Sequence, residues 1–117
     1  MKNRHFKGVH SGKLPATGAA QPLMKNFQCD FVMLSVLNTL DDGADTTMAT
    51  DSNGEYETSD LQIYYGWGGA CVHPLFPTET TTFLPVENAN EIFVRNSLNK
   101  GSNTLVTFTL FRYVEDK

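Results

Sequence analysis

The chain has 117 residues, of which 40% are hydrophobic and 19% charged, and its formal net charge at pH 7 is −4. This length fits one domain that hides about two-thirds of its unfolded surface on folding, so a core needs neither a disulfide framework nor a structural metal. The net negative charge argues against nucleic acid as the main partner, and no apolar run is long enough to cross a membrane.

Residues 1–26 are predicted to form an extended N-terminal arm with a short strand around Phe6 and Val9, because two glycines and two prolines interrupt residues 12–22. Every charged residue in 1–29 is basic. The arm is either a solvated segment or a surface that meets acidic groups of a neighbouring subunit. Under the second interpretation, the candidate partner-binding residues of the arm are Lys2, Arg4, Lys7 and Lys13.

Residues 27–117 are predicted to form an all-β domain, a β-sandwich or jelly roll. Residues 27–38 carry apolar residues at both parities, which indicates a strand buried on both faces or a helix, and a strand is predicted. Strands are also predicted over 61–67, 70–75, 80–86, 91–96 and 103–113. Gly68-Gly69 is expected to form a turn or bulge, and Pro74 marks an edge strand because it cannot donate to a ladder. A turn at 88–90 would pair 80–86 with 91–96 as a hairpin, and a further turn is expected at 99–102.

A long acidic loop is predicted over 39–60, where seven carboxylates lie within 20 positions. A loop of this length is unusual unless it has a function or is disordered. Its Ser52-Asn53-Gly54 sequence suits the tip of a hairpin. A solvated tip is the simpler interpretation of 51–55, because weak calcium binding would need more ligands at set spacing.

The sequence shows no catalytic, cofactor or metal-binding pattern, so the protein is not expected to be an enzyme. His5, His10 and His73 lack metal-ligand spacing. No nucleophile motif and no phosphate-binding glycine loop occurs. Cys29 and Cys71 have apolar neighbours and are expected to be buried, with a disulfide between them left open. The polar, basic start of the chain is unlike a signal peptide, so assembly in a reducing cytoplasm is expected.

Tyr65 and Trp67 alternate along the strand predicted at 61–67, with Ile63 beside them on the same face. One interpretation is core packing. The other is an exposed aromatic platform that binds a protein or a sugar ring.

Several sequence blocks follow one another in a characteristic order. An arm ending in Ala-Ala-Gln-Pro-Leu (19–23) leads to a strand that opens with Cys29. After it come Ile-Tyr-Tyr-Gly (63–66), Pro-Leu-Phe-Pro-Thr-Glu (74–79) and Val-Glu-Asn-Ala-Asn-Glu-Ile-Phe-Val (86–94). In this order the blocks resemble a group of small bacteriophage virion proteins that decorate capsids or sit on virion appendages. Thr78 stands where the family pattern has glycine, and the acidic loop is longer than that pattern.

The resemblance implies a β-sandwich virion component, often oligomeric. The leading hypothesis is a capsid decoration (cement) protein that binds the major capsid protein or another virion protein, with a homotrimer favoured. It would lie on the capsid surface after assembly in the host cytoplasm. The alternative is a receptor- or carbohydrate-binding module of a tail or fibre that uses Tyr65 and Trp67. Deleting residues 1–13 is expected to leave the domain folded and to weaken particle binding.

Overall fold

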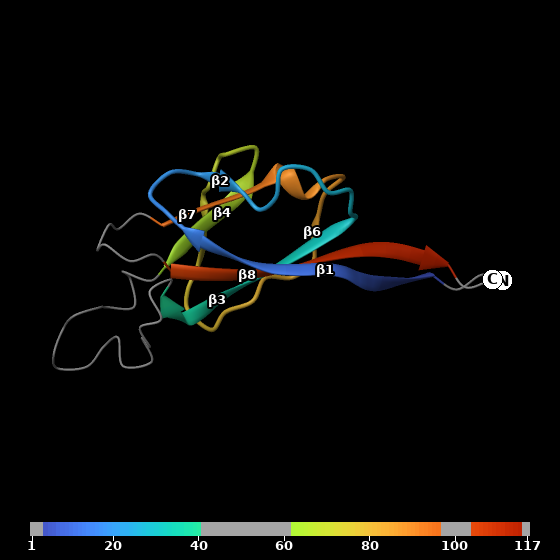
Figure 1. The fold of residues 1–117 in the computed structure, drawn as a ribbon, viewed down its shortest axis with the longest axis horizontal. Coiled ribbons are helices and arrows are strands. Elements are labelled where there is room, and N and C mark those ends of the chain that lie inside the picture. Colours follow the sequence, from blue (N-terminus) through green and yellow to red (C-terminus); the bar gives the residue numbers. More distant parts are fainter. Residues whose placement is uncertain (1–3, 41–61, 97–103, 116–117) are drawn as a thin grey trace, which may run out of the picture.

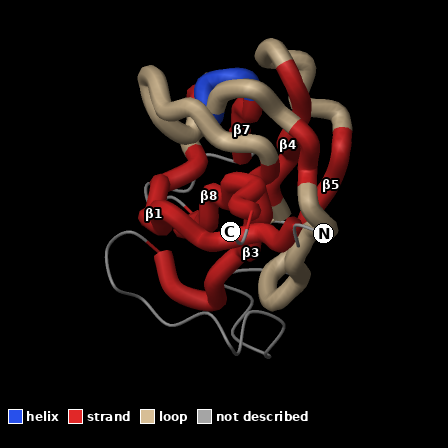
Figure 2. Tube along the Cα trace, turned by 90° about the vertical axis from the view of Figure 1, so that its right-hand side faces the viewer, coloured by secondary structure: helices blue, strands red, loops and turns tan. Residues whose placement is uncertain are grey.

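The computed structural model describes residues 4–40, 62–96 and 104–115. Two four-stranded antiparallel sheets pack face to face (Figures 1 and 2). Sheet A has the order β1 (Arg4–Ala16), β8 (Thr104–Glu115), β3 (Phe31–Leu40) and β6 (Leu84–Pro85). Sheet B has the order β2 (Gln21–Pro22), β7 (Ile92–Asn96), β4 (Ile63–Trp67) and β5 (His73–Leu75). A 3-10 turn, η1 (Ala89–Glu91), precedes β7 and is the only helical element in the described part of the chain. The predicted all-β sandwich is therefore confirmed.

Alternation along the strands builds the core between the sheets. Over residues 32–36 of β3 and 104–110 of β8, every second side chain is buried, and the residues between them lie on the outer face of sheet A. Sheet B contributes the buried Ile63, Ile92 and Val94. The buried apolar side chains of β3 and β8 are Val32, Leu34, Val36, Val106, Phe108 and Leu110. Both sheets thus bury one face, as a sandwich requires.

The basic N-terminal segment differs from the expected arm, because residues 4–16 form β1 and pair with β8 along its length. Only residues 17–26 remain as a connection, which contains the short β2. β3 pairs with β8 no further than Phe31 opposite Phe111. Beyond that point, residues 4–7 and 112–115 continue as a two-stranded ribbon that projects from the sandwich (Figure 1).

The predicted hairpin between 80–86 and 91–96 is wrong. β6 pairs with β3 in sheet A, whereas β7 pairs with β2 and β4 in sheet B. The chain changes sheets at η1, where the Asn88 side chain accepts a hydrogen bond from the Asn90 amide and the Glu91 carboxylate accepts one from the Asn88 amide. This capping box starts a helical turn and directs the chain across the sandwich, so no hairpin closes here.

The turn expected at Gly68-Gly69 is confirmed, since both glycines have positive φ, 67° and 88°, after β4. At 76–79 the Glu79 amide donates to the Phe76 carbonyl oxygen at 3.0 Å, and the Glu79 carboxylate accepts from the Phe76 amide at 2.7 Å. β5 is an edge strand, as Pro74 predicted. The acidic loop beyond Leu40 and the turn at 99–102 lie outside the described residues.

Candidate protein-interaction surface

Five aromatic rings from four segments meet on the outer face of sheet A. We call them the aromatic patch: Phe6, Phe31, Phe83, Phe111 and Tyr113. The Phe6 ring is central, with its centroid 4.5 Å from that of Phe31, 5.0 Å from that of Phe83 and 4.7 Å from that of Tyr113. Edge-to-face and tilted pairs at these distances are favourable beyond the area they bury.

Strand register places these rings on one face. Phe6 lies opposite Tyr113 across the β1–β8 pair, and Phe31 lies opposite Phe111 across the β3–β8 pair. Phe111 and Tyr113 alternate with the inward-facing positions of β8, so their rings point away from the core. Phe83 enters from the segment before β6, with its centroid 5.0 Å from that of Phe111.

The patch has a structural role and also leaves apolar area in contact with solvent. A two-stranded ribbon is marginally stable by itself, and the rings of Phe6 and Tyr113 attach it to Phe31 and Phe83. Nevertheless Phe83 remains 39% exposed and Tyr113 47% exposed. Clustered, exposed aromatic side chains are typical of the centres of protein interfaces.

Sequence reasoning missed this patch, although a signal was present. Segment 27–38 carries apolar residues at both parities, which indicated burial on both faces. From residue 31 to residue 36 only the even positions enter the core, and Phe31 of the other parity belongs to the patch. The sequence could not show that Phe6 and Phe83 join it, because that depends on which strands pair.

Tyr65 and Trp67 lie together at the edge of the core rather than on the outer face. Tyr65 packs against the core, with its ring centroid 5.2 Å from that of His73. Trp67 is 38% exposed, and its indole Nε1 donates to the Pro85 carbonyl oxygen at 3.0 Å, which links the two sheets. The pair shares a face with Ile63, as predicted, and Trp67 contributes the exposed part.

The candidate basic residues do not form one patch. Lys7 and Lys13 are both exposed on β1, but a bulge between Gly8 and His10 shifts the register between them. Lys7 therefore lies opposite Arg112, and Lys13 lies opposite Thr107, so they occupy opposite faces of the sheet. Arg4 begins β1, and Lys2 lies outside the described residues.

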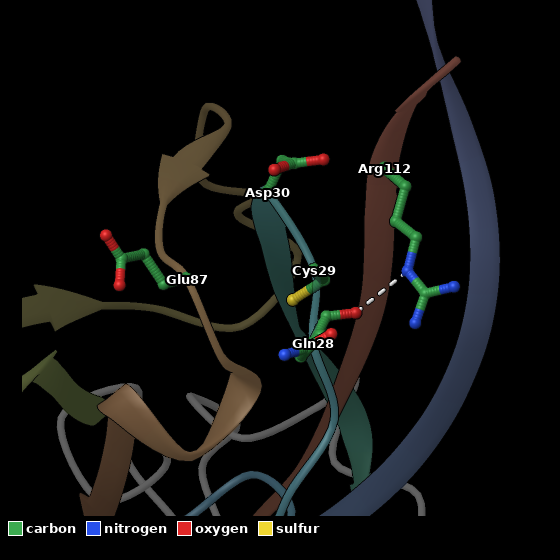
Figure 3. A pocket seen from close by; sticks show the side chains of 5 residues that line it. All are labelled: Gln28, Cys29, Asp30, Glu87 and Arg112. Carbon is green, nitrogen blue, oxygen red and sulfur yellow. Dashed lines mark hydrogen bonds between the residues drawn. The ribbon is translucent and has the colours of Figure 1, made fainter.

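A shallow hollow of about 310 Å³ is lined by Gln28, Cys29, Asp30, Glu87 and Arg112 (Figure 3). The Arg112 Nε donates to the Gln28 carbonyl oxygen at 2.9 Å, and the guanidinium lies 5.2 Å from the Phe27 ring centroid. The Asp30 carboxylate accepts from the Tyr113 amide at 2.8 Å. These contacts fix the segment just before β3 to the end of β8. The residues that line the hollow therefore stabilise the base of the two-stranded ribbon.

Both cysteines are buried and unbonded to each other, and burial raises the pKa of each thiol. Among residues 4–40, 62–96 and 104–115, no cluster of His, Cys, Asp or Glu could hold a metal ion. Within the same ranges, no helix has the length and apolar character needed to cross a membrane.

Comparison of the chain with protein-family models, with curated proteins and with solved structures finds no match. Function must therefore be inferred from the surface itself and from the resemblance of the sequence blocks.

Proposed function

We propose that this chain is a bacteriophage virion structural protein, a capsid decoration protein that binds and stabilises the assembled head. The observation that carries the proposal is the aromatic patch, in which Phe83 and Tyr113 stay exposed on the outer face of a sheet. An exposed apolar cluster on a soluble β-sandwich marks a protein-binding surface. The ordered sequence blocks that resemble phage virion proteins direct the choice of partner.

A decoration protein stabilises a head because it binds the assembled shell and not the free subunits. At a free concentration of 100 times Kd, each occupied site adds about 2.7 kcal/mol to the assembled state. The partner would be the major capsid protein or another virion protein. A homotrimer at a symmetry axis suits this role, because three weak contacts held together bind far more tightly than one.

The test is the heat resistance of heads that lack the protein, measured after purified protein is added back. Wild-type protein should bind and raise the temperature at which the heads open. The double variant Phe83→Ser/Tyr113→Ser should keep the sandwich folded, because neither ring enters the core, and should lose binding by about 100-fold, since it removes two aromatic anchors. Val72→Ser is the matched control because Val72 is 67% exposed and outside the patch. Wild-type protein that leaves heads unprotected would refute the proposal.

A second candidate function, receptor or carbohydrate binding on a tail or fibre, is favoured by one observation. The half-exposed Trp67 ring lies beside His73, with their centroids 6.0 Å apart, and aromatic rings of this kind stack on sugars. Under this function Trp67→Ala would abolish phage adsorption or glycan-array binding. A decoration protein predicts normal adsorption for that variant.

A further inference from the structure

The described edge strands of the two sheets differ in length and in where they contain proline. β2, β5 and β6 are edge strands of two or three residues, and each contains a proline: Pro22, Pro74 and Pro85. Short edges that contain proline resist pairing with another chain. β1, the remaining edge strand, has 13 residues and no proline before Pro15. It is the one described edge long enough to accept another strand.

The chemistry of this edge selects against a second copy of β1. β1 contains basic residues and no acidic residue, so any β1–β1 pairing would bring cations together. Lys7 already lies opposite Arg112 across the β1–β8 pair, and like charges at directly opposed positions are destabilising. The Arg112 guanidinium instead donates a hydrogen bond to the Gln28 carbonyl oxygen. An acidic side chain opposite Lys7 on the other side of β1 would relieve this repulsion.

The same edge has an apolar contact to offer. Phe6 is the member of the aromatic patch that lies on β1, opposite Tyr113 on β8. A strand added outside β1 would place one side chain beside Phe6 and the adjacent side chain beside Lys7, on the opposite face. The edge therefore suits a segment in which acidic and apolar residues alternate. Segment 41–60 of this chain is acidic but does not have that pattern, because Met48 and Tyr56 are its only large apolar residues.

We propose that the outer edge of β1, from Phe6 to Lys13, binds an extended acidic segment of the head shell protein by strand addition. Backbone hydrogen bonds supply affinity in this mode, and alternating side chains supply specificity. The partner's acidic residues meet Lys7 on the face opposite Phe6, whereas Lys13 lies on the other face beyond the bulge and adds only longer-range attraction. This inference rests on the proposed function for the identity of the partner and adds the surface and the partner's chemistry.

The test uses the intact protein and two synthetic peptides of equal length. One alternates glutamate with isoleucine and valine, and its control replaces each glutamate with lysine. The acidic peptide should slow hydrogen exchange of β1 amides between Phe6 and Lys13 and should bind more weakly as salt rises. The lysine peptide should not bind. Slowed exchange at β5 or β6 instead, or equal binding of both peptides, would overturn the proposal.

Charge reversal on the edge gives the second measurement. Lys7→Glu should weaken binding of the acidic peptide about tenfold, because an attractive cross-strand pair becomes repulsive. Lys25→Glu changes net charge equally on the exposed connection before β3 and should change binding less than about twofold. Equal weakening by both variants would overturn the proposal. So would self-association of the wild type that Lys7→Glu abolishes, since the occupant would then be a second copy.

The heat resistance of phage heads distinguishes failure of this inference from failure of the proposed function. If the protein stabilises heads and Lys7→Glu stabilises them equally well, β1 is not the docking edge and the decoration function stands. If the acidic peptide binds β1 and heads gain no stability, the edge is correctly assigned and the partner is another protein.

Discussion

Thr78 adopts a backbone conformation that β-branched residues disfavour. Its φ is 71°, and it is the only non-glycine residue among those described with positive φ. The turn at 76–79 requires this conformation because Pro77 and Thr78 are its central residues and the Glu79 amide closes it onto Phe76. Glycine adopts this conformation without a steric cost, so it is the residue that suits the position best.

Replacing Thr78 with glycine should therefore stabilise the protein. Relief of the left-handed strain outweighs the entropy that glycine adds to the unfolded chain, for a net gain of about 0.5–1 kcal/mol. Urea unfolding followed by circular dichroism measures the change. Thr82→Gly is the control, because Thr82 is exposed and does not have positive φ, and it should lose stability. Loss of stability in Thr78→Gly would show that the threonine is not strained.

Because the two cysteines are buried, the free energy of unfolding is expected to fall at alkaline pH. Desolvation is the main cause that raises the pKa of Cys29 and Cys71 above the ordinary 9.0. The folded state therefore favours the neutral thiol. Its contribution is complete below the pKa of the unfolded chain and is lost as the pH rises through the raised pKa of the folded state.

Between pH 8 and pH 10, the free energy of unfolding should fall more in the wild type than in the Cys29→Ala/Cys71→Ala double variant. Urea midpoints at each pH give the comparison, since the two proteins differ only at the two cysteines. Native wild type should also react slowly with a disulfide reagent at pH 8. Parallel pH curves for the two proteins would contradict this prediction.

At the scale of elements, the end of β4 depends on a glycine that no other residue can replace. A Cβ on Gly66 would overlap the carbonyl oxygen of Ala70, because the turn through Gly68-Gly69 folds back onto the strand. The obstacle is backbone, so no side-chain rotation can relieve it. The same turn holds Tyr65 and Trp67 of β4 in place.

Gly66→Ala should cost at least about 2–3 kcal/mol of stability, in the range of overpacked sites. Gly8→Ala is the matched control on β1, because its Cβ would lie in ordinary contact, 3.6 Å from Thr109 and 3.7 Å from Phe111. It should be neutral or slightly stabilising, since alanine orders a strand better than glycine. Thermal unfolding of both variants measures the difference. Equal melting temperatures would refute the close approach.

Strand positions could be predicted from alternation, whereas strand partners could not. The strands expected over 61–67 and 103–113 appear as β4 and β8 within two residues. The hairpin expected around Asn88 failed, because a capping box and a turn between strands use the same residue types. The bulge in β1 could not be predicted from the local sequence either. Lys7 and Lys13 were therefore predicted to belong to one binding surface, although they lie on opposite faces.

At the scale of the whole molecule, the N-terminal segment is where sequence and structure differ most. Glycines, prolines and scattered lysines are typical of an extended arm. The pairing partner of β1 is β8, about 100 positions away along the chain, and local pattern contains no information about such a pair. The aromatic patch is likewise a product of pairing, since its rings come from both ends of the chain.

The expectation that a chain without residues 1–13 still folds is therefore revised. Deletion removes most of β1 and uncovers one side of β8, including the Phe108 ring that lies directly against Gly12. The truncated chain should lose most of the ~5–15 kcal/mol typical of a domain and should aggregate through the uncovered β8 edge. Deletion of residues 1–3 alone is the control and should melt like the full chain. Circular dichroism melts and size-exclusion chromatography measure both, and a truncated monomer with an unchanged melting temperature would show that β1 is dispensable for the sandwich.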